Sequence, residues 1–251
     1  MTTTTTTTIT TTNTTKHSHC FPSLQGRKLV TVDLCLGRLN DHDLAVVEGT
    51  NNALYYRINF DALRARFAAD NVKLLVWCSP HNPSGRVWSR QELTRVIELA
   101  REFGVKIISD EIHSDLVLPS SGKKHVPLAL VARSLGYENM VMTMSGPGKT
   151  WNLAGCHSGF VVMESPEMRK RYMEVVGHAY LSYGSVFATT TMLAAYANAA
   201  EVEQQRQQRQ QRQQQESSVL GSSTGANTMT DPASWLEDVL QYLDGNIDAL
   251  E

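Results

Sequence analysis

Three short apolar runs follow one another through the middle of the chain, and each of them ends in polar residues. The runs cover residues 74–77, 105–108 and 140–144. Apolar runs of this length, alternating with helical segments, are typical of buried strands in a parallel sheet. Ligands bind at the carboxyl ends of the strands in such sheets. The sequence therefore predicts an α/β protein whose functional residues lie along one edge of a sheet.

A helix is predicted between the first two runs. Ser89 followed by Glu92 three residues later forms a capping box, which starts helices, and Gly104 is a typical helix end. Between them, apolar residues recur at the spacing of one helix face: Leu93, Val96, Ile97 and Ala100.

The same patterns predict the remaining elements. Together with the three runs, strands are expected over residues 27–36, 73–77, 105–108, 139–144 and 158–163. Further helices are expected over residues 61–69, with Asp61 as the cap, and over 166–178, 185–199 and 232–251. Strands and helices in alternation predict a three-layer, mostly parallel sheet with helices on both faces. Because low-complexity sequence stands where earlier strands would be expected, we expect this sheet to be incomplete.

Two low-complexity tracts divide the chain. Twelve of the first fifteen residues are threonine, and residues 204–215 are nine glutamines and three arginines. Such tracts carry no apolar pattern. We therefore expect residues 1–25 to be disordered and 201–231 to be an inserted segment. Residues 26–200 would be the main domain, and 232–251 a helix leading to a further domain.

Composition narrows the classes of partner. A net charge of −2 gives no reason to expect nucleic acid or an anionic membrane as partner, and no apolar run approaches the ~20 residues of a membrane helix.

The four cysteines form no CxxC pair, which favours free thiols in a reducing compartment. With no secretory signal pattern at the N-terminus, the cytoplasm is the expected location. The histidines and cysteine of segment 17–20 lack a fourth ligand, so we predict no metal site.

The polar residues that follow the three runs in the sequence suit the cofactor pyridoxal 5'-phosphate (PLP). This cofactor needs a lysine amine for a Schiff base, an anion beside the pyridine nitrogen, donors to the phenolate oxygen, and a phosphate site. In that order, the candidates are Lys149, Asp110, Asn82 together with His113, and Ser145.

Three motifs carry a family resemblance. They are Asn-Pro-Ser-Gly at 82–85, Ser-Asp-Glu-Ile-His at 109–113 and Ser-Gly-Pro-Gly-Lys-Thr-Trp-Asn-Leu-Ala-Gly at 145–155. Together they resemble the large domain of fold-type I PLP enzymes, the class I/II aminotransferases. Within that family, segments 78–88 and 110–115 resemble the cystathionine β-lyase branch of the MalY/PatB type. The resemblance covers roughly residues 26–200 and, less closely, 232–251.

The resemblance implies a role for each candidate residue. Lys149 would bond to the cofactor and shuttle a proton, Asp110 would pair with the pyridinium, and Asn82 would contact the phenolate oxygen with His113 beside it. Ser145 would touch the phosphate. The family usually places a serine three residues before the lysine, where this chain has Gly146.

Other family features have no visible counterpart in the chain. The family's Gly-rich phosphate loop, its ring-stacking aromatic residue and its carboxylate-binding arginine all fall outside the matched segments. The chain is therefore expected to be a large-domain core cut at both ends.

Three functions follow as expectations. The first is a PLP-dependent carbon–sulfur β-lyase that cleaves cystathionine or related cysteine S-conjugates to a thiol, pyruvate and ammonia, acting as a homodimer. The second is a PLP-dependent aminotransferase, which shares the steps up to the Cα carbanion. The third is a noncatalytic remnant, since a cut core would leave a sheet edge and apolar surface exposed.

Overall fold

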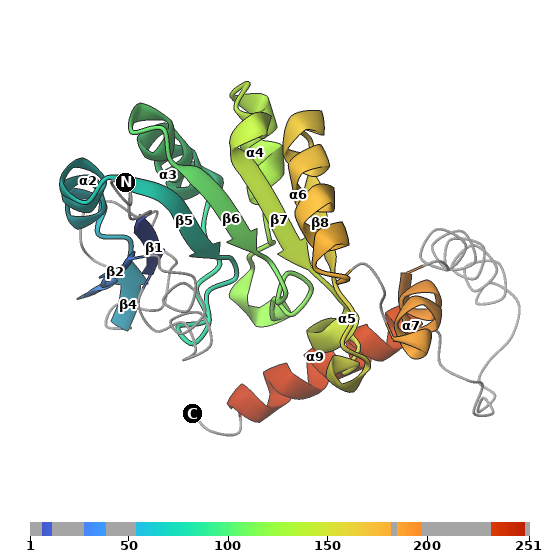
Figure 1. The fold of residues 1–251 in the computed structure, drawn as a ribbon. Helices are drawn as coiled ribbons and strands as arrows, with labels where there is room; N and C mark the ends of the chain where they lie inside the picture. Colours follow the sequence, from blue (N-terminus) through green and yellow to red (C-terminus); the bar gives the residue numbers. More distant parts are fainter. Residues whose placement is uncertain (1–6, 12–27, 39–53, 182–184, 197–231, 249–251) are drawn as a thin grey trace, which may run out of the picture.

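A computed structural model describes residues 7–11, 28–38, 54–181, 185–196 and 232–248 (Figure 1). Its strands are β1 Thr7–Thr11, β2 Lys28–Val32, β3 Cys35–Arg38, β4 Leu54–Arg57, β5 Val72–Cys78, β6 Lys106–Asp110, β7 Val141–Ser145 and β8 Phe160–Met163. Its α-helices are α2 Phe60–Ala69, α3 Arg90–Glu102, α4 Leu128–Ser134, α5 Pro147–Thr150, α6 Pro166–His178, α7 Val186–Tyr196 and α9 Pro232–Asp248. Short 3-10 turns are η1 Pro119–Ser121, η2 Glu138–Met140 and η3 Ala154–Cys156.

The main sheet has the strand order β2-β1-β5-β6-β7-β8. Its neighbours are parallel from β2 through β7, and only β8 runs antiparallel to β7. Strands β3 and β4 form a separate antiparallel pair. The predicted mostly parallel α/β sheet is therefore confirmed.

The threonine tract takes part in this sheet. Thr7–Thr11 lies between β2 and β5 as a parallel strand, with Ile9 opposite Val30 on one side and Leu75 on the other. The expectation of disorder is wrong for these five residues, because β-branched residues suit the extended backbone and both edges of the strand are paired. The rest of segment 1–25 lies outside the described residues, as does the predicted insertion 201–231.

Two local predictions need correction. The single strand expected over residues 27–36 is two strands, β2 and β3, which belong to different sheets and are separated by Asp33 and Leu34. Helix α2 is capped by Asn59, whose side chain accepts a hydrogen bond from the Ala62 N–H at 2.9 Å. The predicted cap, Asp61, lies in the first turn instead, where its charge suits the helix dipole.

Helix α3 forms as predicted. The Ser89 side chain accepts from the Glu92 N–H, and the Glu92 side chain accepts from the Ser89 N–H, so the capping box is complete. Gly104 follows the helix with a φ of +66°, a conformation that glycine adopts without strain. The predicted apolar face is buried in a core shared with α2, α4 and the strands: Leu93, Val96, Ile97 and Ala100.

Helices α7 and α9 lie near the carboxyl ends of the strands, close to α5 (Figure 1). The ring of Trp151, directly after α5, lies 6.4 Å from that of Tyr196 on α7 and 6.1 Å from that of Trp235 on α9. At the other side of this edge, Asp244 on α9 accepts hydrogen bonds from the N–H and hydroxyl of Ser120. None of the described helices is both long and apolar enough to cross a membrane.

Candidate functional site

Strands β5, β6 and β7 end side by side. Asp110, the last residue of β6, lies opposite Cys78 on β5 and Met144 on β7. Two backbone hydrogen bonds extend this row, from the Ser79 N–H to the Asp110 carbonyl at 2.9 Å and from the Glu111 N–H to the Met144 carbonyl at 2.8 Å. Since neighbouring strands lie ~4.8 Å apart, the segments that follow all three strands meet at one edge.

Asp110, His113 and Lys149 share this edge. His113 is half-buried, and burial is the main cause that lowers its pKa. The Asp110 carboxylate raises that pKa and the Lys149 ammonium lowers it, so both charges lie within electrostatic reach of the imidazole. The predicted acid, amine and imidazole are thus brought together, with Lys149 exposed at the start of the segment that follows β7.

Asn82 lies in a tight turn that follows β5. The His81 N–H donates to the Arg86 carbonyl and the Gly85 N–H donates to the His81 carbonyl, both at 2.8 Å. Gly85 has a φ of +66°, a left-handed backbone conformation that glycine adopts without strain. The side chain of Asn82 is left exposed between these two bonds.

Arg86 anchors this turn to the body of the protein. Its buried guanidinium donates to the Tyr56 carbonyl at 2.6 Å and to the Glu92 carboxylate at 2.5 Å. The same group lies 3.8 Å above the ring of Tyr55 and 4.7 Å above that of Trp88. Because Glu92 also completes the capping box of α3, the turn is tied to that helix, a link that the sequence motif alone did not predict.

His81 makes the stability of this turn depend on pH. The ring is 1% exposed, and its Nδ1 lies 2.8 Å from the Ser84 hydroxyl. Burial, with the nearby Arg86 charge as second cause, lowers its pKa to about 4. The unfolded chain therefore binds a proton first as the pH falls. His81 supports the folded state fully above pH ~6.5 and loses that contribution, about 3 kcal/mol, as the pH falls through about 4.

We therefore expect the free energy of unfolding of wild type to fall between pH 6.5 and 4 more steeply than that of a His81→Asn variant. Asparagine places an amide nitrogen near the position of Nδ1 but does not titrate. Urea unfolding at pH 7, 5.5 and 4 measures the difference. Equal slopes for the two proteins would show that His81 is not the titrating group.

Ser145 lies at the carboxyl end of β7, but its hydroxyl is already engaged. Its Oγ donates to the Glu111 carbonyl at 3.2 Å and so joins the ends of β6 and β7. The next residue, Gly146, lies against the segment just before β8: a Cβ there would come within 2.9 Å of both the Gly159 Cα and the Ser158 carbonyl oxygen. The backbones therefore approach too closely for the serine that the family usually carries at this place.

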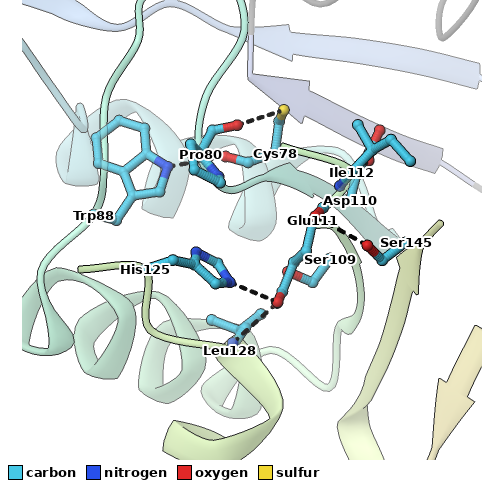
Figure 2. A network of polar contacts seen from close by, with 10 residues as sticks. All are labelled: Cys78, Pro80, Trp88, Ser109, Asp110, Glu111, Ile112, His125, Leu128 and Ser145. Atoms are coloured by element: carbon cyan, nitrogen blue, oxygen red, sulfur yellow. Dashed lines mark hydrogen bonds and ion pairs between the residues drawn. The ribbon is translucent and has the colours of Figure 1, made fainter. Parts of the chain in front are cut away.

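Glu111 organises the polar network behind this edge (Figure 2). Its carboxylate is 4% exposed and accepts from the Ser109 hydroxyl at 2.8 Å, the Leu128 N–H at 3.0 Å and His125 Nε2 at 2.8 Å. If Glu111 is ionised, its carboxylate only accepts, and His125 Nε2 is then the donor in this contact. Sequence reasoning assigned no role to Glu111, because nothing in the sequence links it to His125 or to the start of α4.

Comparison with known proteins places the chain in a family. The family described as aminotransferase class I and II matches residues 43–233. The cystathionine β-lyase PatB of Bacillus subtilis is 37% identical over 142 residues, which is 57% of this chain and 36% of that protein. The protein MalY of Escherichia coli is 34% identical over 139 residues, covering 55% of this chain and 34% of that protein. The chain thus spans about a third of the length of these curated relatives.

Solved structures of PLP-containing proteins have a similar fold. A PLP-bound putative aminotransferase from Clostridium difficile superposes with a TM-score of 0.70 at 26% identity, over 97% of this chain and 49% of that one. Cystalysin from Treponema denticola, which contains PLP, gives a TM-score of 0.57 at 28% identity, over 68% of this chain and 38% of that one. Because the family match covers most of its length, the chain belongs to the aminotransferase class I and II family.

Proposed function

We propose that the chain forms the PLP-binding part of a carbon–sulfur β-lyase that acts on cystathionine or related cysteine S-conjugates. The observation that carries this proposal is the meeting of Asp110, His113 and Lys149 at the end of parallel strands. Support for the lyase reaction comes from the relatives PatB and MalY, because PatB is named a cystathionine β-lyase.

The residues present fit the ring of PLP. Lys149 offers an exposed amine for the aldehyde, Asp110 a carboxylate for the pyridine nitrogen, and Asn82 an exposed amide for the phenolate oxygen, with His113 alongside. The phosphate group of PLP has a less direct partner. The single hydroxyl proton of Ser145 goes to the Glu111 carbonyl, so a phosphate contact at Ser145 requires that hydroxyl to rotate.

The chemistry divides between cofactor and protein. When bound, PLP supplies an electron-accepting ring that stabilises negative charge at the amino acid's Cα. Asp110 holds the proton at the ring nitrogen, which the acceptor role requires. Lys149 Nζ removes the Cα proton as general base. The substrate's Cβ–S bond then breaks, the thiolate takes up a proton, and water converts the remaining three-carbon part to pyruvate and ammonia.

An aminotransferase is the second candidate, favoured by the family match and by the putative aminotransferase among the structural neighbours. The two reactions share the proton removal at Lys149. They differ in whether a leaving group departs from Cβ or a proton returns to the cofactor. A noncatalytic chain is the third candidate.

One assay separates the three functions. The full chain, loaded with PLP, is incubated with cystathionine and, separately, with alanine and 2-oxoglutarate. We expect pyruvate and ammonia in equal amounts from the first mixture. Glutamate from the second mixture alone would favour the aminotransferase, and a colourless protein with no product in either would favour the noncatalytic chain.

The proposal extends to assembly and location. We propose a homodimer, supported by large apolar side chains that α7 leaves exposed: Val186, Phe187 and Leu193. We propose the cytoplasm as location, supported by the free thiols of Cys35, Cys78 and Cys156. The substrate is proposed to be a small amino acid, with neither nucleic acid nor membrane as a partner.

A further inference from the structure

We propose that Thr150 and Asp115 are positioning residues that aim the amine of Lys149, an inference that rests on the proposed PLP site. Thr150 is 1% exposed, and its Oγ1 donates to Asp115 Oδ2 at 2.8 Å. Lys149 precedes it and is exposed. Because successive helical residues point about 100° apart, the buried Thr150 fixes the direction in which its neighbour leaves the backbone.

The segment that carries Lys149 needs such an anchor. Helix α5 spans only Pro147–Thr150, and a single turn has too few hydrogen bonds to hold its own geometry. Its first end is fixed by the close approach of Gly146 to the backbone at Gly159. At its second end, Thr150 donates a hydrogen bond to Asp115, which belongs to the segment that follows β6.

Asp115 belongs to the segment that carries the acid and the imidazole. Backbone turns fold this segment back after β6, from the Ser114 N–H to the Glu111 carbonyl and from the Leu116 N–H to the His113 carbonyl, both at 3.0 Å. The bond between Asp115 and Thr150 therefore links the amine's segment directly to that of Asp110. The carboxylate of Asp115 can act in this way without a desolvation cost, since the residue is exposed.

The test compares two forms of the cofactor. Pyridoxal 5'-phosphate can bond to Lys149, whereas pyridoxamine 5'-phosphate carries an amine in place of the aldehyde and cannot. Thr150→Val removes the hydroxyl but keeps the shape. We expect it to weaken PLP binding about 10-fold, the scale of a hydrogen bond to a charged group, and to leave pyridoxamine phosphate binding within 2-fold. Quenching of tryptophan fluorescence measures both affinities in the full chain.

Matched variants keep the test decisive. Thr150→Ser retains the hydroxyl and should bind PLP like wild type, and Asp115→Ala should reproduce the loss even if Thr150→Val fails to fold. Added to Lys149→Ala, the valine substitution should cause no further loss. Equal weakening for both cofactor forms, or no weakening, overturns the positioning role. Failure of wild type to bind either form overturns the proposed function, and the positioning role with it.

Discussion

Replacing Lys149 with alanine is expected to abolish the covalent attachment of PLP and to lower lyase turnover by a factor of at least ~10³. The residue supplies both the nucleophilic amine and the general base, and loss of a general base alone costs about 10²–10⁴ in rate. Borohydride reduction followed by mass spectrometry of tryptic peptides measures the attachment. In wild type, the added mass should fall on the peptide that contains Lys149.

Lys170 provides the control for this experiment. It is an exposed lysine on α6, so Lys170→Ala should keep both the attachment and the turnover. Retention of the reduced cofactor on the Lys149→Ala protein, or its appearance on another lysine of wild type, would contradict the assignment. Loss of binding in both variants would point to a general effect of removing positive charge.

The second large effect concerns stability and centres on Glu111. Glu111→Ala is expected to lower the free energy of unfolding by about 3–5 kcal/mol, because it leaves three buried donors without their acceptor. Those donors are the Ser109 hydroxyl, the Leu128 N–H and His125 Nε2. Urea unfolding followed by circular dichroism measures the loss, which is a large part of the 5–15 kcal/mol that holds a typical domain together.

Two further variants interpret that measurement. Glu111→Gln keeps one oxygen for Ser109 and Leu128, and its amide can donate to His125 Nε2 if that histidine moves its proton to Nδ1, which has no partner in the described part of the chain. We therefore expect a smaller loss, about 1–2 kcal/mol. Glu98→Ala, at an exposed position on α3, should change stability by less than about 0.5 kcal/mol. If Glu111→Ala were no worse than Glu98→Ala, the network would carry no stability.

The sequence was sufficient where structure depends on neighbours in the chain. The capping box at Ser89 and the three strand ends each follow from residues within a few positions, and the convergence of Asp110 and Lys149 follows from the rule for parallel strands. It was insufficient where partners are distant. The hydrogen bonds from Arg86 to Tyr56 and from Thr150 to Asp115 join residues 30 and 35 positions apart, and no periodic pattern in the sequence predicts them.

The errors have the same physical origin. Asn59 and Asp61 are both acceptable helix caps by residue type, and only the path of the chain out of β4 decides between them. A run of threonine has no apolar pattern, so its composition indicated disorder. Composition does not reveal that β2 and β5 each offer a strand edge to the tract. Pairing with these two edges satisfies the backbone hydrogen-bonding groups of β1 on both sides.

A strand built from one repeated residue has few means to mark its position along its neighbours. Slipping β1 by two residues would again place a threonine opposite nearly every residue of β2, and Ile9 is the one residue of β1 that differs. Gain or loss of threonines at either side of that isoleucine in the sequence would leave the pairing unchanged.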